Sequence, residues 1–252
     1  MKNIFATAAS ILVLGLAMPA MAQSSSSTVN QIGYYNGVSV NQIGTGAVND
    51  SKIQQGLINN NSAHNLADVQ QNGYNIQTNK SEIGQDGIKN EAYVVQGGNG
   101  VGGDTNGSTI KQNGVKNVSS VTQANVEYDN KSGIVQNGIE NLATVDQGNI
   151  LGNNLNNKSD ISQSGYSNEA HVYQGGGLSV NNSEIVQDDP LGFGGNNYAE
   201  VTQKGSSDNE SHLFQHGSAN WAYVTQDSAP GVFNDSVVTQ TGIGNGANVF
   251  QH

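Results

Sequence analysis

The feature that most constrains this chain is an internal repeat that runs through almost the whole sequence. Its clearest copy spans residues 79–96 and reads N-x-S-x-I-x-Q-x-G-x-x-N-x-A-x-V-x-Q. Nine copies follow one another at steps of 24 to 30 residues, and the first has Ser25 in place of the leading Asn. Repeats of this length predict an array of stacked units. The copies span 25–42, 49–71, 79–96, 106–123, 130–147, 157–174, 181–203, 209–226 and 234–251.

Within each copy the recurring residues stand at every second position. Side chains two residues apart lie on the same face of a β-strand, whereas a helix would need a spacing of three and four. Each copy consists of two halves of the form N-x-[S/A]-x-[I/V]-x-Q, joined by a short segment with a glycine, such as Asp86-Gly87 or Asn113-Gly114. These dipeptides are typical of tight turns. Each repeat therefore predicts a strand–turn–strand unit.

A single unit of this kind cannot fold alone. Each of its few inner aliphatic side chains contributes roughly 1.5–3 kcal/mol when buried, whereas each ordered strand residue costs on the order of 1–2 kcal/mol of conformational entropy. Stacked units share hydrogen bonds and a core with their neighbours. We therefore predict an all-β fold, a β-solenoid of nine strand–turn–strand repeats. Its two stacked parallel in-register sheets would have the cross-β order of an amyloid fibre.

Stacking places the same residue type of successive copies in vertical columns. Aliphatic columns would form the core, and columns of Gln and Asn can hydrogen-bond amide to amide, which satisfies polar groups that would be costly to bury singly. The predicted core ladders contain Ile83, Gln85, Asn90, Ala92, Val94, Gln96, Ile110, Gln112, Val121, Gln123, Ile134, Gln136, Val145 and Gln147.

The first 22 residues have the features of a secretory signal peptide. Lys2 precedes an apolar run over residues 11–16, and Ala20-Met21-Ala22 is a small-x-small cleavage site. The apolar run is too short to span a bilayer. We therefore predict that residues 1–22 are removed and that residues 23–252 form the exported solenoid, without membrane insertion.

Composition and spacing give no sign of chemistry. The net charge of −11 argues against nucleic acid, which needs a basic surface, and the absence of Cys excludes disulfides. The acidic residues are spread along the repeats, and the five His have no spacing typical of a metal site. We predict no catalytic residue, no cofactor and no metal site, and therefore a protein that is not an enzyme.

The half-repeat, together with the Q-x-G-x-x-N that joins the halves, resembles the curlin repeat over residues 25–252. That family comprises the major and minor subunits of curli, the extracellular amyloid fibres of bacterial biofilms, and residues 238–252 resemble the last repeat of the major subunit. The resemblance implies a secreted fibre subunit at the bacterial cell surface, exported through the periplasm. It also implies a nucleator subunit and an outer-membrane secretion channel as partners. The chain departs from the family in its larger number of repeats and in its short segment before the first repeat.

No polar capping segment is evident at either end of the array, although soluble repeat proteins usually have one. We therefore expect the terminal repeats of successive copies to dock head to tail, which builds an open homopolymer. The alternative is a monomeric secreted β-solenoid that serves as an adhesin or surface-binding module. The predicted interface comprises Val29, Gln31, Asn36, Val38, Val40 and Gln42 of the first repeat, and Ser236, Val238, Gln240, Asn245, Ala247, Val249 and Gln251 of the last.

Overall fold

The described residues form β-strands and no helix. The computed structural model describes residues 11–16, 24–45, 47–56, 63–74, 78–98, 105–124, 129–148, 156–176, 179–189 and 195–252. The proposed cleavage site at residues 20–22 lies outside this part of the chain. None of the described residues belongs to a helix long and apolar enough to cross a membrane.

The strands alternate along the chain between two sheets, which we call the even sheet and the odd sheet after their strand numbers. The even sheet contains β2 (Ser24–Gln31), β4 (Val48–Gln55), β6 (Thr78–Ile88), β8 (Thr105–Val115), β10 (Asp129–Ile139), β12 (Asn156–Tyr166), β14 (Val180–Asp188), β16 (Asn209–Ser218) and β18 (Asn234–Ile243).

The odd sheet has ten strands in the described residues. It contains β1 (Ile11–Leu16), β3 (Gly37–Thr45), β5 (Leu66–Tyr74), β7 (Glu91–Gly98), β9 (Val118–Ala124), β11 (Leu142–Gln147), β13 (Glu169–Gln174), β15 (Tyr198–Gly205), β17 (Trp221–Ser228) and β19 (Gly246–Gln251).

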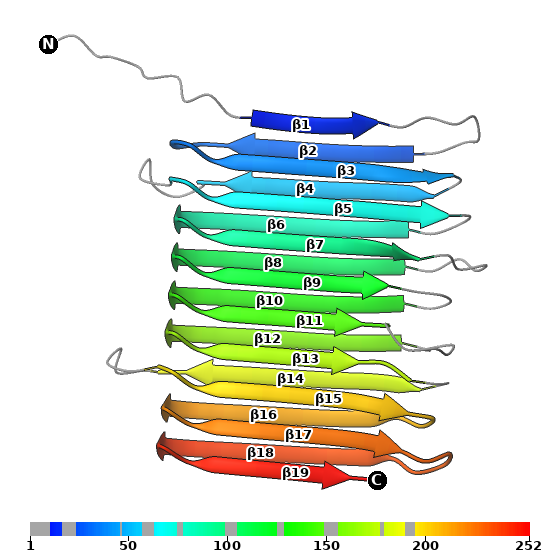
Figure 1. Ribbon diagram of the computed structural model, residues 1–252, viewed down its shortest axis with the longest axis vertical. Helices are drawn as coiled ribbons and strands as arrows, with labels where there is room; N and C mark the ends of the chain where they lie inside the picture. The colour runs from blue at the N-terminus through cyan, green and yellow to red at the C-terminus, as the bar shows by residue number, and fades with distance from the viewer. Residues whose placement is uncertain are drawn as a thin grey trace, which may run out of the picture.

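Every strand pairs in parallel with its counterpart in the next repeat, so each repeat forms one rung of a β-solenoid (Figure 1). The register follows the repeat, since Ile134 of β10 pairs with Ile110 of β8 on one side and with Ile161 of β12 on the other. The predicted all-β solenoid with two parallel in-register sheets is confirmed, with nine strand–turn–strand rungs in the described residues.

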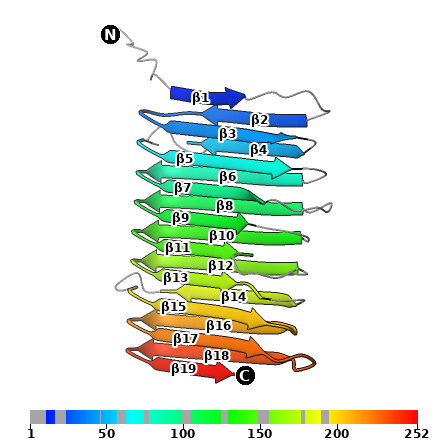
Figure 2. The same ribbon diagram turned by 45° about the vertical axis from the view of Figure 1, so that its right-hand side comes forward.

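The two sheets face each other across a thin core. Along each strand, buried and accessible residues alternate, as in β11, where Ala143, Val145 and Gln147 are buried. The aliphatic core forms one continuous cluster from Val38 to Val238. Figure 2 shows the two sheets lying one behind the other over the full length of the stack. The period-two pattern of the sequence thus corresponds to the inner face of each sheet.

The turn inside each rung differs in part from the expected tight turn. The predicted glycines do adopt positive φ, for example 107° at Gly87 and 124° at Gly114. A Cβ on Gly87 would lie 2.0 Å from the carbonyl oxygen of Gly114, so the glycines are also needed for the close approach of successive rungs. A second left-handed residue follows two positions later, and it is Lys89 in this rung.

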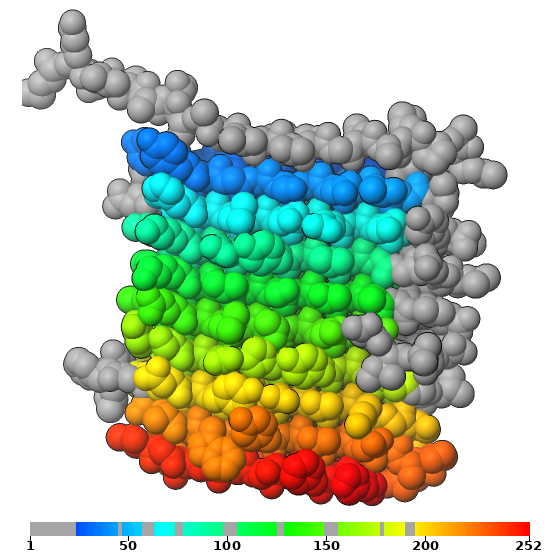
Figure 3. Space-filling view, viewed as in Figure 1, coloured from blue at the N-terminus to red at the C-terminus, as the bar shows by residue number. Residues whose placement is uncertain are grey.

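The rungs succeed one another in flat layers from one end of the molecule to the other. In Figure 3 the colours pass from blue to red in chain order, and the red residues of the last rung form one end of the stack. The end strands are β2 and β18 in the even sheet, and β1 and β19 in the odd sheet. The molecule is therefore a short rod with two β edges at each end.

Candidate functional site

The residues predicted to form core ladders lie in columns between the sheets. Ile83, Ile110 and Ile134 occupy one column of the even sheet, and Val94 and Val121 occupy the facing column of the odd sheet. All fourteen predicted ladder residues are buried: Ile83, Gln85, Asn90, Ala92, Val94, Gln96, Ile110, Gln112, Val121, Gln123, Ile134, Gln136, Val145 and Gln147.

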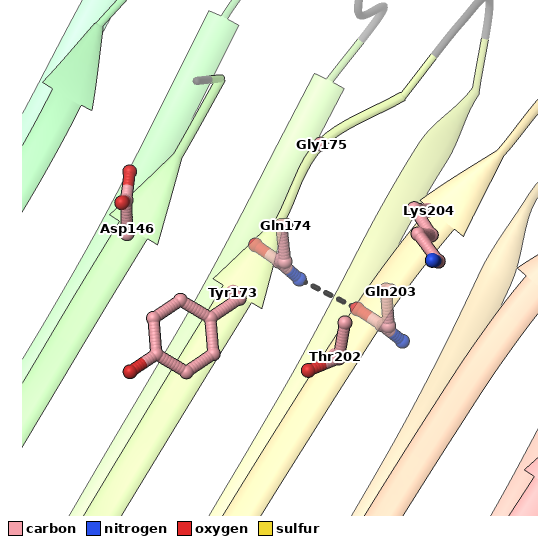
Figure 4. A pocket seen from close by; sticks show the side chains of 7 residues that line it. All are labelled: Asp146, Tyr173, Gln174, Gly175, Thr202, Gln203 and Lys204. Carbon is pink, nitrogen blue, oxygen red and sulfur yellow. Dashed lines mark hydrogen bonds between the residues drawn. The ribbon is translucent and has the colours of Figure 1, made fainter. Parts of the chain in front are cut away.

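Each ladder Gln holds two neighbours at once. The Nε2 of Gln85 donates to the Oε1 of Gln112 at 2.8 Å and to the main-chain oxygen of Leu66 at 2.9 Å. Figure 4 shows the same step in the odd sheet, where Gln174 donates to Gln203 at 2.8 Å. One amide therefore links successive rungs and also links the two sheets, which satisfies a buried polar group that would otherwise be costly.

The Gln ladders have a direction. At every step from Gln31 to Gln240 and from Gln42 to Gln251, the amide nitrogen of one Gln donates to the oxygen of the Gln in the next rung toward the C-terminus. Their dipoles therefore add along the stack, in the way that aligned hydrogen bonds strengthen one another.

The Asn ladders run the opposite way. Asn106 donates its Nδ2 to the Oδ1 of Asn79 in the preceding rung at 2.9 Å, and Asn141 donates to Asn117 at 3.0 Å. The same direction holds at nearly all other steps of the two Asn columns. At the first two steps of the odd-sheet column, the backbone N–H groups of Asn65 and Asn90 donate to the Oδ1 of the preceding Asn. Gln and Asn thus give each end of the rod a different set of hydrogen-bonding atoms.

At the C-terminal end of the described stack, the ladders finish on unmatched atoms. The Nε2 atoms of Gln240 and Gln251 each donate to a main-chain oxygen, at 3.0 and 2.6 Å, but have no further Gln to meet. The Oδ1 atoms of Asn234 and Asn245 receive no hydrogen bond from another ladder Asn. This end presents Gln donors and Asn acceptors.

The N-terminal end presents the complementary set. Gln31 and Gln42 donate into the stack at 2.8 Å, and no ladder Gln among the described residues donates to their Oε1 atoms. Asn36 directs its Nδ2 to the main-chain oxygen of Ile32 at 2.9 Å rather than to another ladder Asn. The first rung has Ser25 in the other Asn column, and the Nδ2 of Asn49 is consequently buried without a partner.

The predicted interface residues all lie in the two end rungs, and they are less well covered than their counterparts inside the stack. Val29, Ala247 and Val249 are only partly buried, and Val238 is 7% exposed, whereas Ile134 is fully buried. Val38, Val40 and Gln42 are the best covered of the set, at 2–3% exposure, and Asn36, Ser236 and Gln240 are also buried. The polar interface residues sit beside the aliphatic ones in the inward columns: Gln31, Asn36, Gln42, Ser236, Gln240, Asn245 and Gln251.

One strand was not expected from the sequence. β1, which lies within the predicted signal peptide, pairs in parallel with β3, with Ile11 opposite Gly37 and Leu16 opposite Gln42. In the full chain, a strand of the predicted leader therefore covers the edge of β3, whereas the expectation of uncapped ends concerns residues 23–252 and stays a prediction. In the described residues, the outer edges of β2, β18 and β19 have no paired strand.

The outer faces hold several shallow features. On the odd sheet, a hollow of about 220 Å³ lies beside the Tyr173 ring, with Asp146, Thr202 and Lys204 around it (Figure 4). On the even sheet, His212 contacts the carboxylates of Glu184 at 2.9 Å and Glu210 at 3.2 Å. Across the described ranges, no group of three or more His, Asp or Glu gathers in a way that could hold a metal ion.

No protein-family model matches this sequence, and no curated protein matches it. The similarity to the curlin repeat therefore rests on the repeat pattern itself. The geometry on which a function can be argued is that of the two end rungs, with their open strand edges and opposite amide polarity.

Proposed function

We propose that the mature chain is the structural subunit of an extracellular, curli-like amyloid fibre in a bacterial biofilm matrix, where it supports adhesion and scaffolding. The subunits stack head to tail through their end rungs. On the curlin resemblance, a nucleator subunit and an outer-membrane secretion channel are its further partners. The observation that carries the proposal is the opposite amide polarity of the two ends.

A second copy placed on the stack as the next rung would match this polarity. The Nε2 donors of Gln240 and Gln251 would meet the Oε1 acceptors of Gln31 and Gln42, as in each interior step. The Oδ1 of Asn245 would receive the Nδ2 of Asn36. Two identical ends brought together would oppose donor to donor, so the polarity favours a heterologous contact, which does not close and yields a filament.

The aliphatic columns support the same contact. Head-to-tail stacking would place Val238 over Val29 and Val249 over Val40, so that the partly buried Val29 and Val249 gain the neighbour that their counterparts have inside the stack. The outer edges of β18 and β2 would pair as another parallel step. Strand addition at an open edge supplies main-chain hydrogen bonds, while the side-chain columns set the register.

The leader bears on this contact. β1 pairs with residues 37–42 of β3, and a stacked β19 of another copy would meet the same residues, so β1 occupies the edge on which β19 would dock. Removal of residues 1–22 would free that edge. We expect the full chain to add to seeds more slowly than residues 23–252, and the two forms can be compared by thioflavin fluorescence at equal concentration.

The test uses one substitution that places a charge in the contact. Val249→Lys would put an ammonium group between stacked rungs, while the matched control, Asn248→Lys, adds the same charge to the outward face of the same strand. The mature V249K chain retains an intact N-terminal rung. A small fraction of it should therefore join wild-type fibres and terminate their growth, whereas N248K should elongate normally.

Three outcomes decide the proposal. Termination by V249K but not by N248K, with fibres that show a meridional repeat of about 4.7–4.8 Å, supports head-to-tail stacking. If the two variants affect fibre growth equally, the inward side of β19 does not take part in elongation. A wild-type chain that stays monomeric even with seeds would favour the adhesin instead. Circular dichroism of each monomer checks that the variants keep the β fold.

A further inference from the structure

The lysines of this acidic protein gather on one face. Five of them point outward from the even sheet, whereas Lys204 is the only lysine on the outer face of the described odd sheet. Lys80, Lys131 and Lys158 stand in one outward column of β6, β10 and β12. At the β8 position of this column stands Gly107, so the row of long side chains has a gap.

The gap is the floor of a hollow of about 510 Å³. A Cβ added at Gly107 would meet only the Cγ of Lys131, at 4.0 Å, so the space above it is empty. A second glycine, Gly133, lines the hollow in the next column of β10, and the Asp160 carboxylate lies over it, with Oδ1 2.7 Å from the position of an added Cβ. The volume is within the range of about 300–1,000 Å³ typical of ligand sites. The lining residues are Lys80, Glu82, Thr105, Gly107, Ser108, Thr109, Lys131, Ser132, Gly133, Lys158 and Asp160.

The charges around the hollow do not cancel. Its two carboxylates already have partners, since Glu82 contacts Lys52 at 2.9 Å and Asp160 contacts Lys158 at 2.8 Å. Lys80 and Lys131 form no ion pair with any described residue. They stand two rungs apart, which is about 9–10 Å along the solenoid axis. The hollow therefore offers two free ammonium groups and the hydroxyls of Thr105 and Thr109.

We infer that this hollow binds an acidic polysaccharide, with sugar carboxylates or sulfates on Lys80 and Lys131 and sugar hydroxyls on the threonines. The lysine column follows the solenoid axis, so an extended polymer can place successive charged groups on it. The site lies on the outer face of interior rungs, away from the end contacts, and it therefore does not depend on the proposed assembly.

Other polyanions fit less well. Nucleic acid has a dense row of phosphates and needs an extended basic surface, whereas the excess positive charge here is local and the whole chain carries −11. Single strands also need aromatic side chains on which bases stack, and none lines the hollow. An acidic sugar polymer needs no aromatic surface for stacking, and it can place single carboxylates on Lys80 and Lys131 without a basic surface that extends along the whole molecule.

The first arm of the test changes charge. Binding of residues 23–252 to immobilised polygalacturonate, with neutral dextran as the reference, is measured at low salt by surface plasmon resonance. Lys80→Gln combined with Lys131→Gln should weaken binding about tenfold or more, as expected for the loss of two charge-assisted contacts. The control, Lys89→Gln with Lys116→Gln, removes the same charge at the turns and should leave the affinity within about twofold.

The second arm changes shape and leaves charge alone. Gly107→Thr fills the floor in a strand position whose backbone suits a β-branched residue. It should weaken polygalacturonate binding as much as the lysine pair does. Gly84→Thr is the control, because a Cβ at this strand position meets nothing within 4 Å and lies outside this hollow.

The inference fails if the two double lysine variants weaken binding equally, because binding would then depend on the overall charge of the protein and not on this hollow. It also fails if G107T binds like wild type, or if dextran or a single-stranded oligonucleotide binds as tightly as polygalacturonate. Chains that carry Val249→Lys should bind polygalacturonate normally, which separates failure of this site from failure of the proposed assembly.

Discussion

An interior rung and an end rung share one sequence pattern but differ in how completely the pattern is satisfied. In β10, Ile134 is fully buried, and Gln136 accepts from Gln112 and donates to Gln163 and to a main-chain oxygen. In β18, Gln240 accepts from Gln215 but donates to no ladder partner. A rung is therefore stabilised by the rungs on both sides of it, and the same residue type contributes more to the free energy of unfolding inside the stack than at its end.

The largest expected difference between an interior rung and an end rung is the loss of stability when the same side chain is shortened in each. Val145 and Val249 occupy the same odd-sheet column, but Val145 is 2% exposed and Val249 is only partly buried. In monomeric chain, Val145→Ala should lower the free energy of unfolding by about 2 kcal/mol or more, because it leaves a cavity. Val249→Ala should cost less than about 1 kcal/mol. Urea unfolding measures both.

In the fibre, Val249→Ala is expected to cost more stability than it does in the monomer. If head-to-tail stacking buries Val249, then Val249→Ala should lower the stability of fibres toward denaturant by nearly as much as Val145→Ala does. A substitution at Val249 that leaves fibres as stable as wild type would show that this column does not continue from one copy to the next.

The next largest difference in stability between an interior rung and the last rung is expected at the turn glycines. Gly138 has a φ of 135°, and a Cβ there would lie 1.9 Å from the carbonyl oxygen of Gly165. Its counterpart in the last rung, Gly242, has a φ of 113°, but its Cβ would meet only the Nδ2 of Asn245, at 3.5 Å. Both substitutions to Ala incur the cost of positive φ, about 1–3 kcal/mol.

Only Gly138→Ala also pushes two rungs apart. It should therefore lower the melting temperature more than Gly242→Ala does, and a thermal scan of the two monomers measures the difference. Equal melting temperatures would mean that the glycines are needed for their φ alone and not for the close stacking of rungs.

A smaller effect concerns the His212 contacts near the C-terminal end. The hydrogen bond to the Glu184 carboxylate in the adjacent rung raises the pKa of His212 above its ordinary value of 6.5, and Glu210 acts in the same direction. A raised pKa stabilises the fold fully below about 6.5, and this contribution is lost as the pH rises through the higher folded value. The contact should therefore strengthen as the pH falls from 8 toward 6.

His212→Gln should remove that part of the pH dependence and leave stability at pH 8 almost unchanged. The measurement is urea unfolding at several pH values. His216→Gln is the control, because the His216 ring is more exposed and lies 3.6 Å from Asp188. If the two variants flatten the profile equally, the pH dependence does not come from the His212 contacts.

Much of the fold is readable from spacing, because a parallel in-register stack needs only a period of two and equal repeats. The strands, the pairing of Ile134 with Ile110 and Ile161, and the burial of Gln136 all follow from that pattern. Recurrence marks the Gln columns as ladders, since a polar residue at every rung finds the same residue above and below it.

Other features depend on backbone or atomic detail that residue types do not reveal. The second left-handed residue of the turn is Lys89, Glu140 or Ser167 in different rungs, so no composition marks it. The direction of the amide ladders depends on which amide atom faces which rung. The pairing of β1 with β3 is missed because the same residues have the features of a cleaved leader. The hollow over Gly107 is missed because a glycine at this outward position looks like an ordinary variation of the repeat.

The finest comparison concerns the Ser column of the even sheet. The Oγ of Ser159, inside the stack, is buried without a hydrogen-bond partner, whereas Ser236 of the last rung lies 3.4 Å from the Nε2 of Gln226 as a weak acceptor. The facing column of the odd sheet has Ala at the same place, as at Ala170. At Ser159 the small size of serine is therefore what the column requires, although Ser132 in another interior rung lies 3.5 Å from the Nε2 of Gln123.

Ser159→Ala should consequently leave the unfolding free energy unchanged or raise it by up to about 1 kcal/mol, because it removes an unsatisfied polar group without leaving a cavity. Ser236→Ala should be neutral or slightly destabilising in the monomer. Chemical unfolding of the two variants beside wild type measures both effects. A loss of more than about 1 kcal/mol at Ser159 would mean that its hydroxyl is hydrogen-bonded in solution, and the interior rungs would then owe part of their stability to a third polar ladder.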